Sequence, residues 1–194
     1  MPFCFDIETL GTESTSAILS FACCYYDGKE LSFRKLLDNT FFVKIDVQDQ
    51  IKRFGRTTDK NTMEWWSKQT PHAKKKSLIP SPDDVKTETA LALFHKWISQ
   101  KPDWQNDMVW VRGSLDHPVF ESLVKATGKK IFIPYNMFRD VRTAVQCFYP
   151  NEKGGYVDVD LKKIPDFDPS SIFKHDPVID VCLDFCMLFG GVTE

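Results

Sequence analysis

The alternation of apolar and polar positions is clearest at the N-terminus, where residues 4–11 read Cys-Phe-Asp-Ile-Glu-Thr-Leu-Gly. This pattern predicts a short strand that ends in a turn. Side chains of a strand alternate between its faces, so Asp6 and Glu8 share one face and Ile7 lies on the other. Two neighbouring carboxylates repel each other, and Mg²⁺ or Mn²⁺ would neutralise them because hard divalent ions prefer carboxylate oxygens. A solvated strand end is the alternative interpretation.

The apolar runs that follow predict an antiparallel ribbon. An apolar run covers residues 16–26, and Asp27-Gly28 then predicts a tight hairpin turn. Residues 31–36 are expected to return as the partner strand, and residues 41–45 to form another short strand. We therefore expect the strand that carries Asp6 to belong to a largely antiparallel opening.

A short helix is predicted around two adjacent tryptophans, Trp65 and Trp66. Asn61 and Glu64 have the spacing of a capping box, and Pro71 follows the helix. Neighbouring helical positions point about 100° apart, so both indoles cannot face one core. Either one is buried with the other at its edge, or the pair forms a stacking platform for bases. The basic residues around this helix would then supply a phosphate-binding patch: Arg53, Arg56, Lys74, Lys75 and Lys76.

Strands and helices are expected to alternate after residue 80. The predicted elements are a helix from Ser81-Pro82 with its apolar face between Val85 and Ile98, a strand at residues 108–111, a helix after Pro118 ended by Gly128, a strand at residues 131–134 and a helix at residues 139–148.

Residues 149–174 are the least regular part of the sequence. The aspartates there are expected to be solvated loop residues: Asp158, Asp160, Asp166 and Asp168. A final helix is predicted beyond them, with Asp176 as its N-cap and Pro177 as its first residue.

Composition narrows the class of protein. The 194 residues are read most simply as one domain, 1–194, and 42% hydrophobic content is enough for a sizeable core. A net charge of −2 excludes a global basic field, although an enzyme that binds phosphates through metal ions needs only local basic patches. With no visible signal peptide or membrane span, we expect a cytoplasmic protein. The six cysteines show no CxxC pair and are expected to be reduced thiols.

Five residues stand at element ends with the chemistry of a hydrolytic site: Asp6, Glu8, Asp116, His175 and Asp180. Asp116 follows the carboxyl end of a predicted strand, where α/β folds place their sites. Four carboxylates from three separate segments can hold two Mg²⁺ about 3.5–4 Å apart. His175, on the loop ahead of the last helix, can take the proton from the attacking water.

In this order the motifs resemble those of the DnaQ-like 3′→5′ exonucleases of the DEDDh type. The resemblance covers nearly the whole chain. It implies a ribonuclease H-like α/β fold, in which a mixed central sheet has antiparallel N-terminal strands followed by parallel strands and is flanked by helices. Three further stretches resemble the phage exonuclease A branch, some of whose bacterial relatives are exoribonucleases: Thr62-x-Glu64-Trp65-Trp66-x-x-Gln69, Arg112-Gly113-x-x-Asp116-x-Pro118 and Arg139-Asp140-x-Arg142-Thr143.

The resemblance also implies roles for individual residues. Asp6, Glu8, Asp116 and Asp180 would hold two Mg²⁺ or Mn²⁺ ions, and His175 would be the general base. Substrate would be bound by Thr9, Leu10, Trp65, Trp66, Gln69, Arg112 and Arg142, with Trp66 favoured as the tryptophan that faces a base. If the chain is phage-encoded, its location would be the host cytoplasm. Homodimers occur among similar enzymes, but the sequence identifies no interface.

We expect a metal-dependent exonuclease that shortens single-stranded nucleic acid from its 3′ end and releases nucleoside 5′-monophosphates, with DNA slightly favoured over RNA. The alternatives are an exoribonuclease, a small-oligonucleotide phosphodiesterase and a catalytically silent nucleic-acid-binding module. The presence of all five catalytic-type residues argues against the silent module.

Overall fold

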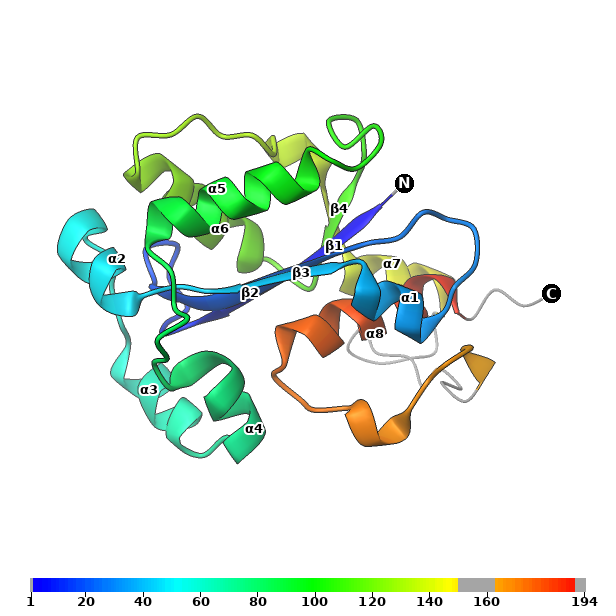
Figure 1. Cartoon of the computed structure of the whole chain (residues 1–194), viewed down its shortest axis with the longest axis horizontal. Coiled ribbons are helices and arrows are strands. Elements are labelled where there is room, and N and C mark those ends of the chain that lie inside the picture. The colour runs from blue at the N-terminus through cyan, green and yellow to red at the C-terminus, as the bar shows by residue number, and fades with distance from the viewer. Residues whose placement is uncertain (1, 150–162, 191–194) are drawn as a thin grey trace.

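A mixed five-stranded sheet, with strand order β3-β2-β1-β4-β5, forms the centre of the molecule (Figure 1). The computed structural model describes residues 2–149 and 163–190. The strands are β1 (Phe3–Thr9), β2 (Ile18–Tyr25), β3 (Thr40–Lys44), β4 (Val109–Val111) and β5 (Phe138–Asp140). β1 to β3 pair antiparallel, whereas β1, β4 and β5 pair parallel. The mixed sheet expected from the sequence is confirmed.

Helices cover both faces of this sheet. In Figure 1, α5 and α6 lie above the strands, and α1, α7 and α8 lie below them. The helical elements are α1 (Phe33–Asp38), α2 (Val47–Phe54), α3 (Lys60–Ser67), α4 (Pro71–Ala73), the π-helical turn η1 (Lys74–Leu78), α5 (Thr87–Ile98), α6 (Asp116–Ala126), the 3₁₀ turn η2 (Tyr135–Met137), α7 (Val141–Phe148), the 3₁₀ turn η4 (Pro169–Ser171) and α8 (Pro177–Phe189).

The alternation along β1 separates two cores. Phe5 faces α5 and α6, where its ring lies 5.8 Å from the ring of Phe94 and 5.1 Å from that of Phe120. Cys4 belongs instead to the core on the α8 side. Asp6 and Glu8 continue the Cys4 face, so the two carboxylates point toward α8, as the pattern predicted.

The hairpin expected after residue 26 is wrong. Asp27-Gly28 does turn the chain, but the segment predicted as a returning strand is the helix α1. Ser32 caps it by accepting a hydrogen bond from the N–H of Lys35, and Phe33 and Leu36 bury one helical face. Spacing of three residues between apolar positions suits a helix, whereas a strand needs alternation. β3 then pairs with β2, so the antiparallel opening itself is confirmed.

Two helix starts also differ from the sequence prediction. Asp59, not Asn61, caps α3, because its side chain accepts the N–H of Thr62. Ser81 and Asp84 close a local turn through two hydrogen bonds, and α5 begins only at Thr87. Val85 forms a β-bridge with Ile45 instead of packing in a helix. Local turns and caps use the same residue types, so the signal at Ser81 was ambiguous.

Three later element boundaries are corrected in the same way. The strand expected at residues 131–134 is absent from the described chain, and β5 begins four residues beyond Pro134. The helix expected from Arg139 begins at Val141 with Asp140 as its N-cap. α6 starts at Asp116, ahead of Pro118.

The segment before α8 confirms part of the loop prediction. Asp176 is the N-cap of α8 and Pro177 its first residue, as expected. Asp168 is a local cap, and Asp166 accepts a hydrogen bond from Ser32, so it is tied to α1 instead of being simply solvated. Asp158 and Asp160 lie outside the described residues. All six cysteines are free thiols, and no helix in the described stretches is long and apolar enough to cross a bilayer.

Candidate active site

Three carboxylates meet where β1 approaches its carboxyl end. Asp6 and Glu8 come from β1, and Asp180 lies in the first turn of α8. One oxygen from each of the three side chains lies within 4.8 Å of the other two. Asp116, at the start of α6, adjoins this group; it is 5% exposed and accepts a hydrogen bond from the N–H of Ile7. Segments that are far apart in sequence thus bring the four predicted metal ligands together.

Burial and mutual repulsion disfavour the ionised form of the carboxyl groups in this acidic cluster. Burial raises the pKa of Glu8 to about 8, and repulsion by Asp180 and Asp116 adds to the shift. Burial likewise raises the pKa values of Asp116 and Asp180 to about 7 and that of Asp6 well above its usual range. Four carboxyl groups, two of them buried and two half-buried, that resist carrying charge by themselves form a donor set that suits a hard divalent cation.

A fifth acid, Asp184, was not singled out by the sequence reasoning. It is 4% exposed and follows Asp180 by one helical turn on α8. Arg112, directly after β4, donates to Asp184 Oδ1 from Nη2 at 2.5 Å and from Nε at 2.8 Å. Burial raises the pKa of Asp184, and the guanidinium lowers it. An aspartate at four-residue spacing from Asp180 in an otherwise apolar helix was the signal that could have found it.

His175 lies beside the acidic cluster. Its Nδ1 is 4.0 Å from Glu8 Oε1, and its side chain is 38% exposed. The imidazole meets the indole of Trp65 edge to face, with 4.8 Å between ring centroids. Burial lowers the pKa of His175, and the nearby Lys174 acts in the same direction. The neutral, proton-accepting form is therefore favoured near neutral pH.

One of the two tryptophans is buried and the other is exposed, as the helical geometry requires, but the exposed one is Trp65 and not the expected Trp66. Trp66 is fully buried, and its Nε1 donates to the backbone oxygen of Thr9 at 2.9 Å. Trp65 is 41% exposed. The expectation that Trp66 faces a base is wrong, because a buried indole offers no free ring face. Trp65 is the member of the pair that a ligand can reach.

A cavity of about 660 Å³ opens next to Glu8 and Trp65. Its lining combines the end of β1, the start of α3 and the loop before α6: Ile7, Glu8, Thr9, Gly11, Thr12, Asp59, Asn61, Thr62, Trp65, Trp66 and Leu115. This volume lies in the range of ordinary small-ligand pockets, about 300–1,000 Å³. Sequence reasoning missed Asn61 and Leu115 as lining residues, because only tertiary packing brings α3 and the loop before α6 to the end of β1.

The other residues expected to bind substrate have different surroundings. Leu10 is buried against Trp66 and lies outside the cavity lining. Gln69 donates to the backbone oxygen of Trp65. Arg112 is engaged with Asp184 as described. Arg142 is exposed, and its guanidinium carbon lies 3.7 Å from the point where a Cβ would stand on Gly113. The charge of Arg142 lowers the pKa of Asp116.

The basic patch expected around α3 is wrong for Arg56. This side chain is 4% exposed and donates to backbone oxygens of Ser14 and Ser16 and to Ser122 Oγ. Burial lowers its pKa to about 10. Arg56 therefore anchors the loop after β1 instead of contacting phosphate. Arg53 pairs with Asp49 and Glu88.

Comparison with known proteins identifies the family. The family described as the 3′-5′ exoribonuclease Rv2179c-like domain matches residues 1–170 of the chain. The chain belongs to this family. An exodeoxyribonuclease of Enterobacteria phage T4 is 26% identical over 204 aligned residues, which cover 96% of this chain and 86% of the phage protein.

A solved structure shares the fold of this chain. The nuclease domain of 3′hExo, a DEDDh family member bound to rAMP, superimposes with a TM-score of 0.58; the match has 13% identity and covers 96% of this chain and 89% of that domain. The ribonuclease H-like fold predicted from the sequence is confirmed. The chain is thus a member of a 3′→5′ exonuclease family, and the hydrolase assignment is likewise confirmed.

Proposed function

We propose that this exonuclease removes nucleoside 5′-monophosphates one at a time from the 3′ end of single-stranded nucleic acid. The observation that carries the proposal is the meeting of Asp6, Glu8 and Asp180 within 4.8 Å, beside His175 and an open cavity. The carboxylates are suitable ligands for a divalent metal ion, and the neutral imidazole can accept a proton from the attacking water. The cavity leaves room for the terminal nucleotide. A divalent cation bound to these carboxylates would also offset the cost of placing several acids close together away from water.

Asp6, Glu8, Asp116 and Asp180 would hold Mg²⁺ or Mn²⁺, with two ions as the arrangement we favour. Bound divalent ions supply an activated water and stabilise the leaving oxygen in hydrolysis of this kind. Around them, His175 Nδ1 faces Glu8 and can accept a proton on that side of the cluster. The Arg112–Asp184 pair lies one turn further along α8, where it ties the end of β4 to the helix that carries Asp180.

The exposed ring of Trp65 would stack on the terminal base. Base–aromatic stacking is worth roughly 1–3 kcal/mol per base. Thr9 lines the same cavity. Arg142 projects near Asp116, where it would contact a phosphate of the incoming strand.

DNA is the substrate we favour, because the phage relative that matches nearly the whole chain is named an exodeoxyribonuclease. RNA is the second candidate, since the description of the matching family is that of an exoribonuclease domain. A dinucleotide-only phosphodiesterase would need a cavity closed beyond two nucleotides.

A single assay separates these possibilities. The purified protein is incubated with 5′-labelled single-stranded DNA and RNA of one sequence, with Mg²⁺ or Mn²⁺ and with a chelator. We expect a stepwise ladder in metal, mononucleotide 5′-phosphates as the product, and no cleavage in chelator. The faster of the two ladders identifies the substrate. Uncut oligonucleotides beside a rapidly cleaved dinucleotide would contradict the proposal, as would full activity in excess chelator.

A further inference from the structure

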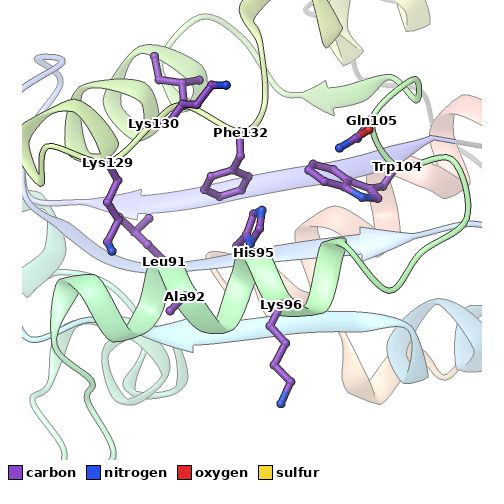
Figure 2. A pocket seen from close by; sticks show the side chains of 10 residues that line it. Leu91, Ala92, His95, Lys96, Trp104, Gln105, Lys129, Lys130 and Phe132 are labelled. Atoms are coloured by element: carbon purple, nitrogen blue, oxygen red, sulfur yellow. The ribbon is translucent and has the colours of Figure 1, made fainter.

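A second cavity, of about 590 Å³, opens on the face of the sheet that α5 and α6 cover. It lies across the sheet from the acidic cluster, which faces α8. One wall is α5, and the other is the chain around residues 104–105 and 129–132 (Figure 2). Its lining residues are Leu91, Ala92, His95, Lys96, Trp104, Gln105, Lys129, Lys130, Ile131 and Phe132. Nothing in the exonuclease site uses them.

Three aromatic rings form a row along this cavity. Figure 2 shows Phe132, His95 and Trp104 side by side above α5. The ring of His95 lies 4.9 Å from that of Phe132 and 5.8 Å from that of Trp104, edge to face in both cases. His95 is exposed, and the other two rings are partly exposed. An edge-to-face contact covers a face of only one ring of the pair, and the exposed parts of these rings can stack on a planar base.

The charge of the lining is uniform. Lys96, Lys129 and Lys130 are exposed lysines of the lining, and none of its ten residues is an acid. Within residues 2–149 and 163–190, none of these three lysines forms an ion pair. The lining is therefore locally basic in a chain of net charge −2. Lysines placed next to exposed aromatic rings match the two parts of a nucleotide, its phosphate and its base.

We propose that this aromatic–lysine cavity is a second binding site for a nucleotide unit of the single-stranded substrate, away from the scissile end. A base stacks against Trp104 or Phe132, and the adjoining phosphates lie against Lys129 and Lys130. The proposal rests on the proposed exonuclease function. The second site would increase the affinity for longer strands. It would not cleave them, because its lining holds no acidic metal ligands.

The test compares a long and a short substrate. Single-turnover and steady-state rates are measured with an oligonucleotide of about 16 nucleotides, the upper range of single-strand site sizes, and with a dinucleotide. We expect the double variant Lys129→Glu/Lys130→Glu to raise KM for the long substrate about tenfold, equivalent to ~1.4 kcal/mol. Its kcat for the long substrate and both constants for the dinucleotide should stay at the wild-type level. Trp104→Ala should act in the same direction, and thermal melts check that it folds.

The matched control is Lys29→Glu/Lys52→Glu, which makes the same charge change at two exposed lysines outside both cavities. An equal rise of KM in the control would show a general charge effect and overturn the second site. Wild-type KM in the Lys129→Glu/Lys130→Glu variant, or an equal change with the dinucleotide, would overturn it too. If the wild-type protein shortens no oligonucleotide with either metal, the exonuclease function fails instead, so the two failures are distinguishable.

Discussion

His175 has a backbone φ of 60°, in the left-handed region that few residues other than glycine adopt. Such strain costs of order 1–3 kcal/mol and persists where the surrounding structure fixes it. Here the next residue, Asp176, bonds to His72 Nε2 at 2.8 Å, and Phe173 stacks on the His72 ring at 3.9 Å. The segment that carries His175 is therefore held against α4 from both sides of the strained residue.

Replacing His175 by alanine and by glycine should separate stability from catalysis. Both variants should lose roughly 10²–10⁴ in kcat, because the proposed proton acceptor is gone. Glycine accepts a positive φ without strain, so His175→Gly should be more stable than His175→Ala by about 1 kcal/mol. Chemical denaturation and single-turnover rates measure the two effects.

The pH profile of the wild-type protein checks the same role. A base must be neutral, so the rate should fall as pH falls through the pKa of His175, and burial places that pKa below its ordinary value of about 6.5. Both His175 variants should lack the part of this acid limb that is due to the base. Near-wild-type turnover in folded His175→Ala would remove His175 from the mechanism.

Trp65 and Trp66 should respond in opposite ways to the same change. Trp65→Ala should weaken oligonucleotide binding by roughly 1–3 kcal/mol with little loss of stability, because its ring is 41% exposed. Trp66→Ala should cost roughly 3–5 kcal/mol of stability, because it empties a buried site and breaks the bond to Thr9. Binding curves and urea melts on both variants provide the measurement. Trp65→Phe, which keeps a ring, serves as the control for binding.

At the scale of elements, the Arg112–Asp184 pair ties the end of β4 to α8, the helix that supplies Asp180. Arg112→Met should lower the free energy of unfolding by roughly 3–5 kcal/mol, because Asp184 is left as a buried charge without its partner. Arg112→Met/Asp184→Leu should recover much of this loss, since both charges are then gone. Urea unfolding in the presence of chelator isolates the pair from metal binding. Equal stability of Arg112→Met and wild type would show that the ion pair contributes nothing.

The whole molecule should respond to pH and metal together. Glu8, Asp116 and Asp180 have folded pKa values of about 8, 7 and 7, well above the values of about 4 for unfolded carboxyl groups. A carboxyl group with a raised folded pKa contributes stability at low pH that is lost as pH rises through the folded value. Without metal, the protein should therefore become less stable between about pH 4 and pH 8.

In thermal melts with chelator, the Tm at pH 8 should be lower than the Tm at pH 5.5 by at least about 5 °C. For a chain of this size, such a shift corresponds to a loss of more than ~1 kcal/mol in the free energy of unfolding. Mg²⁺ should raise Tm more at pH 8 than at pH 5.5, because it binds the ionised carboxylates. Asp180→Asn should show a shallower pH dependence and a weaker metal effect. A Tm that rises with pH in chelator would contradict the electrostatic account of the cluster.

Much of this architecture was readable from local patterns. The alternation at residues 4–8 placed Asp6 and Glu8 on one face, and Asp176-Pro177 set the start of α8, because both signals act within a few residues. The segments at residues 31–36, 81–84 and 131–134 were misread. In these segments the sequence signals, namely a capping residue, a turn motif or a short apolar run, are compatible with more than one secondary structure. Tertiary packing decided which one forms.

The sequence by itself determined which residues make up the candidate site: carboxylates in the order Asp6, Glu8, Asp116 and Asp180, with His175 ahead of the last. Only the tertiary structure decided which neighbours complete it. Burial is a property of the packed molecule, so it chose Trp65 over Trp66 as the reachable ring, hid Arg56 and paired Arg112 with Asp184. The aromatic–lysine cavity exists only because residues 104–105 and 129–132 fold back against α5. The local periodicity of the sequence indicates on which face of its own helix or strand a residue lies. The contacts between distant elements depend on how these faces pack against each other, which local periodicity does not specify.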